Sequence, residues 1–178
     1  MRHLTKGRWA TSLLTVSVLI ITRVLIITTL TINNAVASQQ VYRGVNQAEF
    51  DGSTQYFSGK VHVKMAFPSN DIAHYSGAYV TFAKGARTAW HSHPAGQHMI
   101  VTAGTAITVT RDSTVLTFHP GEAVWCPPGI DHWHGATTKE PMTHFVVTAA
   151  NAQGKNVFWK EQVADDDYAK ANRLSLEQ

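Results

Sequence analysis

The chain contains one cysteine, Cys126, among its 178 residues. An intrachain disulfide is therefore impossible, and stability has to come from the core, for which this length is sufficient for one domain. Cys126 has no basic neighbour in the sequence that would activate its thiol, so we do not predict a nucleophile there. The sequence also lacks a Ser-His-Asp order, a phosphate-binding loop, a pair of catalytic acids and internal repeats.

Residues 38–178 lack an excess of basic charge. They hold 11 Lys and Arg against 12 Asp and Glu, whereas residues 1–37 hold four basic residues and no acid. The formal net charge of +3 is thus a property of the N-terminal segment. Nothing in the remaining chain favours binding to nucleic acid.

The N-terminal segment resembles a secretory signal. A basic start is followed by two apolar runs, 13–21 and 24–30, and by the small-residue sequence 35–37 before Ser38. Arg23 interrupts the apolar stretch, and a charged side chain is costly at a bilayer centre. We expect cleavage after Ala37 and a periplasmic or secreted protein. The alternative is that the segment stays uncleaved and anchors the protein to a membrane as a helix, in which case this helix is its only membrane contact.

The rest of the chain predicts many short strands and little helix. We expect a polar arm over 38–59 with a helical turn near 46–50, and one domain over 60–178. Alternating apolar residues and Gly or Pro turns predict strands at 60–67, 78–83, 87–93, 97–103, 105–111, 114–118, 123–126, 132–135, 143–150 and 157–160. The segments 97–103 and 105–111 are predicted to form a hairpin around Gly104. Asp165 is a candidate N-cap for a short helix over 166–173. This pattern is typical of an all-β sandwich or barrel.

Four side chains have the spacing of metal ligands. His91 and His93 are two residues apart and share one face of a strand, and Gln97 follows a turn at Pro94 and Gly96. His132 lies on a distant predicted strand. We predict from this spacing that the four converge on one divalent metal inside a barrel. Nitrogen and oxygen donors without thiolate suit Mn, Fe, Co, Ni or Zn.

Two motifs resemble those of the cupins. Gly85-x5-His91-x-His93-x3-Gln97-x6-Gly104 resembles the first cupin motif, and Gly121-x5-Pro127-x-Gly129-x2-His132 the second; the 16 intervening residues match the short connection of small cupins. The resemblance implies a cupin jelly-roll β-barrel with a short C-terminal helix. It also implies a homodimer, because cupins commonly pair through barrel edge strands.

Gln97 stands where cupins usually have a glutamate, and Ala136 where they usually have an asparagine. Three neutral imidazoles and a neutral amide would leave the charge of the ion uncompensated. Such a centre is a strong Lewis acid that favours an anionic ligand.

The match is closest to the small manganese cupins that act as hydroxynitrile lyases, resembling (R)-mandelonitrile lyases. It rests on residues 85–97, on His132-Trp133-His134-Gly135 and on Met142-Thr143-His144. The resemblance implies manganese as the leading metal. It places His134 and His144 near the metal, either as catalytic groups or as structural hydrogen-bonding residues. It also implies that Ala78, Val80 and Thr148 line a pocket for a small-molecule substrate.

These features predict a metal-dependent lyase that cleaves a cyanohydrin, with His144 taking the hydroxyl proton and the metal holding the cyanide anion. Three alternatives remain open at this point. The chain could be a cupin dioxygenase, an enzyme related to the cupins associated with carboxymuconolactone decarboxylases, or an exported protein that binds metal or a small ligand without catalysis.

Overall fold

The computed structural model describes residues 38–177. The predicted leader, its cleavage site and the possible anchor fall within residues 1–37 and lie outside the described residues. Among residues 38–177, no helix is both long and apolar enough to cross a membrane.

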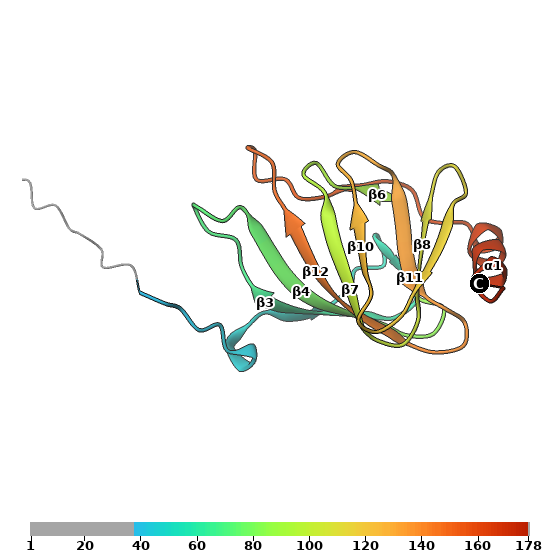
Figure 1. The fold of residues 1–178 in the computed structure, drawn as a ribbon, viewed down its shortest axis with the longest axis horizontal. Coiled ribbons are helices and arrows are strands. Elements are labelled where there is room, and N and C mark those ends of the chain that lie inside the picture. The colour runs from blue at the N-terminus through green and yellow to red at the C-terminus, as the bar shows by residue number, and fades with distance from the viewer. Residues whose placement is uncertain (1–37, 178) are drawn as a thin grey trace, which may run out of the picture. The chain divides into compact units, whose positions relative to one another are not determined.

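Residues 40–177 form two antiparallel sheets and one helix (Figure 1). One sheet has the strand order β1 (Glu49–Asp51), β3 (Val61–Phe67), β4 (Tyr75–Phe82), β12 (Met142–Ala149), β7 (Gln97–Ala103), β10 (Ala123–Cys126). The other has the order β13 (Phe158–Trp159), β6 (His91–Ser92), β11 (His132–Ala136), β5 (Arg87–Thr88), β2 (Phe57–Ser58), with β8 (Ala106–Thr110) also pairing with β11, and β9 (Val115–Phe118) with β8. No strand is shared between the two sheets in this part of the chain, which has the jelly-roll arrangement predicted from the sequence.

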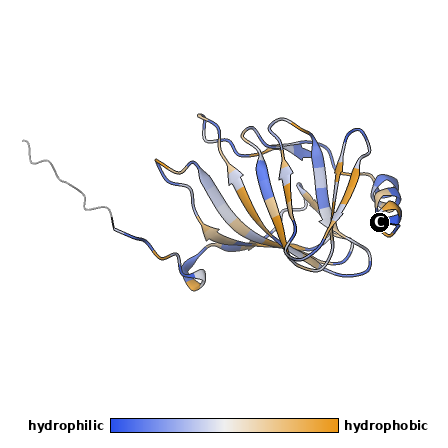
Figure 2. Cartoon of the chain, in the orientation of Figure 1, coloured by the Kyte–Doolittle hydropathy of each residue, from blue (hydrophilic) through white to orange (hydrophobic). Residues whose placement is uncertain are grey.

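Alternation along the strands builds the core. In β12 every second side chain is buried, beginning with Met142, while the residues between are partly exposed. Strands in Figure 2 accordingly carry both hydrophobic and hydrophilic segments. The inward side chains form one apolar cluster, in which Phe82, Met99 and Met142 are almost completely buried. Burying each such side chain contributes about 1.5–3 kcal/mol to folding, so this cluster is the main source of stability.

The predicted hairpin around Gly104 is wrong. β7 pairs with β10 and β12, whereas β8 pairs with β9 and β11, so Gly104 carries the chain from one sheet to the other. Gly104 has a φ of +70°, and a Cβ there would lie 2.0 Å from the carbonyl oxygen of Pro141. A turn glycine therefore marks a change of sheet here, which local sequence does not distinguish from a hairpin.

The segment before β3 differs from the predicted polar arm with a helical turn. A short 3₁₀ helix spans Gly44–Asn46, and β1 follows where the turn was expected to continue. β1 pairs with β3, and β2 pairs with β5, so residues 49–58 add one strand to each sheet.

The helix α1 (Asp165–Leu174) packs beside β8 (Figure 1). Its N-cap is Ala164, without a side-chain hydrogen bond, so the prediction of Asp165 as N-cap is wrong by one residue. The carboxylate of Asp165 instead accepts a hydrogen bond from Arg87 at 2.5 Å. Tyr168 links the helix to the second sheet, because its hydroxyl donates a hydrogen bond to the carbonyl oxygen of Ala136 at 2.8 Å.

Candidate metal centre

Three histidines from the second sheet converge at one point. His91 begins β6, His93 follows that strand, and His132 begins the neighbouring strand β11, paired in register with His91. One ring nitrogen of each lies within 4.8 Å of the others, and all three side chains are buried. The structure thus brings together three of the four residues predicted as ligands from their spacing.

The orientation of the three imidazoles is fixed from behind. Each ring places Nδ1 against a backbone carbonyl, which can only accept, so Nδ1 carries the proton and Nε2 keeps its lone pair. The Nε2 atoms of His93 and His132 are buried and have no hydrogen-bond partner. The carbonyls belong to Ala89 for His91 (3.0 Å), Asn156 for His93 (2.7 Å) and Ile130 for His132 (3.0 Å).

Gln97 supplies an oxygen from the opposite sheet. It begins β7, its side chain is buried, and Nε2 of its amide donates to Oγ1 of Thr148 at 2.9 Å. The other end of the amide, Oε1, is buried without a hydrogen-bond partner. Unpaired buried polar atoms are costly, and a cation coordinated by the lone pairs of Gln97, His93 and His132 would satisfy them. The donor set therefore fits a divalent metal.

The histidines are neutral at physiological pH, as metal ligation requires. Burial lowers the pKa of His93 to about 4, an effect opposed by its contacts with the Asn156 carbonyl and Gln97. Burial is also the main reason that the pKa values of His91 and His132 lie below the usual range for histidine. No carboxylate belongs to the three-histidine cluster in residues 38–177, so the site offers only neutral donors.

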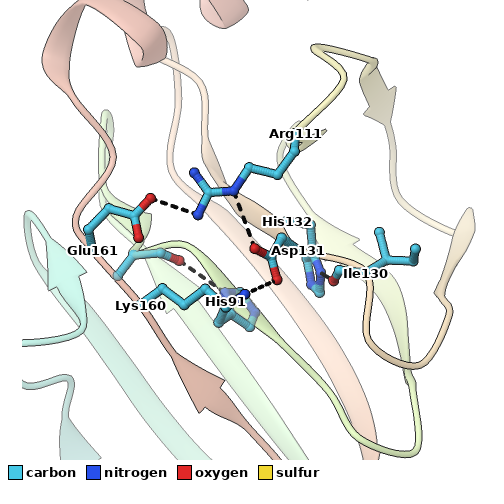
Figure 3. A network of polar contacts seen from close by, with 8 residues as sticks. His91, Arg111, Ile130, Asp131, His132, Lys160 and Glu161 are labelled. Carbon is cyan, nitrogen blue, oxygen red and sulfur yellow. Dashed lines mark hydrogen bonds and ion pairs between the residues drawn. The ribbon is translucent and has the colours of Figure 1, made fainter.

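An ionic network is centred on Asp131, the residue before His132 (Figure 3). Asp131 accepts a short hydrogen bond from Lys160 and pairs with Nε of Arg111 at 3.3 Å. Arg111 also pairs with Glu161 at 2.7 Å and lies 3.8 Å from the ring centre of Trp90. The contact with Lys160 is the main cause of a lowered pKa for the Asp131 carboxyl. This network joins the end of β8 and the segment after β13 to the residue before a candidate ligand.

His134 and His144 lie beside the candidate ligands. The ring centres of His134 and His91 are 5.1 Å apart, and those of His134 and His144 are 5.0 Å apart. His144 is almost completely buried against Phe82, and neither of its ring nitrogens has a hydrogen-bond partner. Burial lowers its pKa to about 3. The neutral ring of His144 therefore has both nitrogens free to hydrogen-bond with a molecule in the adjoining cavity.

A cavity of about 460 Å³ opens beside these histidines. Its wall includes Ala78, Val80 and Thr148, the three residues predicted to line a pocket. His91, His93, Gln97, His134 and His144 also line the cavity, which is otherwise mostly apolar. This volume lies in the range of small-molecule sites, so one space contains the candidate ligands, the two further histidines and room for a ligand.

Comparison with known proteins accords with this geometry. Residues 78–148 match the family described as "Cupin domain". The (R)-mandelonitrile lyase of Granulicella tundricola is 42% identical over 131 residues, which cover 74% of this chain and 99% of that protein. The protein belongs to the cupin family.

Solved cupin structures have the same fold. A cupin-like protein from Thermotoga maritima, 35% identical, has a TM-score of 0.64 and covers 68% of this chain and 91% of its own. A cupin 2 conserved barrel domain protein from Rhodopseudomonas palustris, 16% identical, has a TM-score of 0.53 and covers 75% and 91%, respectively. At that identity the second likeness concerns the fold alone.

The aromatic wall of this cupin was missed from the sequence. The ring centre of Trp159 lies 4.9 Å from that of His91 and 4.7 Å from that of Tyr56, on which it stacks. Phe57 makes edge-on ring contacts with both Trp159 and Phe82. Tyr56 and Phe57 belong to the segment predicted as a polar arm, yet both line the cavity. Both lie about a hundred residues from Trp159 in the chain, and the local sequence carries no signal for these ring contacts.

Arg87 forms its ion pair at the start of α1. It contacts the Val163 carbonyl at 3.1 Å and the carboxylate of Asp165 at 2.5 Å. It is buried away from the cavity, so it does not contribute a cation to the site of this cupin.

Proposed function

We propose that this cupin is a metal-dependent lyase that cleaves a small cyanohydrin into a carbonyl compound and hydrogen cyanide. The observation that carries the proposal is the juxtaposition of the three-histidine cluster, the unpaired histidine His144 and a largely apolar cavity. The 42% identity to an (R)-mandelonitrile lyase supports the same reaction class.

His91, His93, His132 and Gln97 would hold the metal. Manganese is the ion proposed, on the basis of the resemblance between the motifs, and Fe, Zn, Co and Ni fit the same donors. When bound, a divalent ion supplies a Lewis acid that stabilises negative charge without a compensating protein carboxylate. The remaining chemistry belongs to side chains of this chain.

His144 is the proposed proton carrier. Its neutral ring offers one nitrogen as an acceptor for the hydroxyl proton of a substrate in the cavity. Because its pKa is about 3, the ring is neutral at physiological pH and its nitrogen lone pair is free to accept. The proton then passes to the leaving cyanide carbon, so that the O–H and C–C bonds break while a C=O bond and the C–H bond of hydrogen cyanide form. Phe82 shields the ring from water, and His134 packs against it edge-on.

The apolar wall is suited to the organic part of such a substrate. Val80, Val146 and Phe57 line the same cavity as His144, and their side chains exclude water from the reacting groups. A cupin that only binds metal would be expected to have a closed site without a neighbouring cavity. The cavity of about 460 Å³ therefore favours a site that takes up a small molecule over one that binds metal alone.

The test is turnover of mandelonitrile by the metal-loaded protein, followed by the appearance of benzaldehyde. We expect activity in wild type and a loss of about 10²–10⁴-fold in kcat for His144→Ala, the usual contribution of acid–base catalysis. The control is His74→Ala, which alters an exposed histidine outside the cavity. Equal rates in wild type and His144→Ala would remove His144 from the mechanism. Absence of turnover with every divalent ion would refute the lyase, and oxygen consumption in a substrate screen would favour a dioxygenase.

Export to the periplasm and assembly as a homodimer do not follow from the side chains of the site. Both stay predictions. Sequencing the N-terminus of the mature protein tests cleavage before Ser38, and light scattering on the purified protein tests the dimer.

A further inference from the structure

The amide of Gln97 has two chemically different ends. An oxygen can coordinate a cation, whereas the NH₂ group has no lone pair available for one. The value of Gln97 as a metal ligand therefore depends on which end faces His91, His93 and His132. A glutamate at this position would not face that choice, because both ends of a carboxylate are oxygens.

Thr148 supplies the acceptor that the ligating orientation of Gln97 needs. It lies directly opposite Gln97 on the neighbouring strand β12, and its Oγ1 accepts the hydrogen bond from Nε2 of Gln97 at 2.9 Å. Both side chains are buried. With the NH₂ group held at Thr148, Oε1 is left unpaired at the other end.

The contacts of His93 are consistent with this arrangement. Its Nδ1 is engaged by the Asn156 carbonyl at 2.7 Å, so Nε2 faces the interior of the site, where Gln97 is also in contact with the ring. A reversed amide would place NH₂ against the lone pair of His93 Nε2 and remove that nitrogen from the ligand set. The Thr148 hydroxyl can donate as well as accept, so it can pair with either end of the amide. Only the ligating orientation, however, places the buried NH₂ group at Thr148, and that group depends on Thr148 for an acceptor.

We propose that Thr148 is a positioning residue for the metal site, which fixes the Gln97 amide with its oxygen toward the three histidines. The predicted role of Thr148 was to line the substrate pocket; here it acts through a ligand. The hydroxyl works because its own proton is free to turn away from Gln97 while its oxygen accepts. This inference rests on the proposed metal-dependent function, since it concerns the ligand set of that site.

The variant that tests the proposal is Thr148→Val, which keeps the shape of the side chain and removes the hydroxyl. Loss of a hydrogen-bonding partner behind a metal ligand typically weakens metal binding by about 10–100-fold. We expect a loss of about tenfold or more in Mn²⁺ affinity, measured by calorimetric titration of the metal-free protein. Thr148→Ser retains an acceptor at the same place and should restore binding to within about threefold of wild type.

Two comparisons separate orientation from general damage to the cavity wall. In a Gln97→Glu background, Thr148→Val should cause no loss of Mn²⁺ affinity, because a carboxylate presents an oxygen in either orientation. Ser76→Ala removes another cavity-lining hydroxyl, from the residue paired with Thr148 on β4, and should leave affinity unchanged. The absorption spectrum of the Co²⁺-loaded protein should change in Thr148→Val and remain as in wild type in Ser76→Ala, since it reports the ligand set directly.

The outcomes are distinct. If wild type binds Mn²⁺ and Thr148→Val binds it equally well with the same Co²⁺ spectrum, Thr148 does not position the amide and this inference is overturned while the proposed function stands. A loss of equal size in the Gln97 and Gln97→Glu backgrounds also overturns it, because the effect would then be independent of amide orientation. If wild type binds neither ion, the proposed function and this inference both fall.

Discussion

Replacing His144 with leucine should make the metal-free protein more stable while abolishing its proposed catalytic step. Both ring nitrogens of His144 are buried without hydrogen-bond partners. An unsatisfied buried polar group costs about 1–3 kcal/mol, and an apolar side chain of similar bulk removes that cost. Leucine has a different shape, which offsets up to about 1.5 kcal/mol. The two unpaired nitrogens cost about 2–6 kcal/mol together, so after this offset we expect the free energy of unfolding at pH 7 to rise by at least about 0.5 kcal/mol.

The size of this gain should depend on pH. The pKa of His144 is about 3 in the folded protein, below its ordinary value of 6.5, because burial disfavours the charged ring. Between these values the unfolded chain binds a proton at residue 144 that the folded chain does not bind. The wild-type protein therefore keeps its full stability above pH 6.5 and loses stability as the pH falls toward 3. Each pH unit is worth about 1.4 kcal/mol, so the advantage of His144→Leu over wild type should grow by about 2 kcal/mol between pH 7 and pH 5.

Urea unfolding of metal-free wild type and His144→Leu at pH 7 and pH 5 measures both effects. The other histidines are common to the two proteins, so the difference between them isolates residue 144. His74→Leu removes an exposed imidazole and serves as the control, with unfolding curves close to those of wild type at both pH values. A stability difference that is the same at pH 5 and pH 7 would refute the account of His144 as a buried neutral ring. A destabilised variant at pH 7 would show that its nitrogens make contacts that stabilise the fold.

Three further predictions concern other parts of the chain. Gln97→Glu should raise Mn²⁺ affinity roughly tenfold or more, because a carboxylate compensates the charge of a buried ion, and an unchanged affinity in calorimetric titration would argue against Gln97 as a ligand. Cys126, whose thiol pKa is raised to about 12 by burial, should react with a thiol reagent at pH 8 roughly a hundredfold more slowly in the native than in the urea-unfolded protein; equal rates would contradict its buried position. Tyr168→Phe removes the 2.8 Å hydrogen bond to the Ala136 carbonyl and should lower the free energy of unfolding by about 0.5–1.5 kcal/mol in urea denaturation, whereas no change would show that this bond does not stabilise the docking of α1.

The sequence predicts the strands of this protein better than their partners. Alternation of apolar residues is a local property, so β3, β7 and β12 lie within about a residue or two of the predicted ranges. Pairing is a long-range property. Gly104 was expected to close a hairpin, but the glycine conformation required there serves equally to move the chain between sheets.

The candidate site was predictable where its geometry follows from strand periodicity. His91 and His93 share a face because they are two residues apart. Gln97, just beyond a turn, and His132, on a distant predicted strand, completed the predicted ligand set, which the motif resemblance then supported. Partners drawn from distant segments were not predictable. The pairing of Arg87 with Asp165, and the contact of Trp159 with Tyr56, join residues separated by about eighty to a hundred positions. Nothing in the spacing of those residues indicates that they meet.

The candidate ligands come from both layers of the fold, since His91 and His132 belong to one sheet and Gln97 begins a strand of the other. An ion held by all of them would cross-link the two sheets, between which no strands pair in residues 38–177. Loading the protein should then slow amide hydrogen exchange in β7 and β11 together, and chelation should release both at once. The metal would be a structural fastening of the barrel as well as its reactive centre.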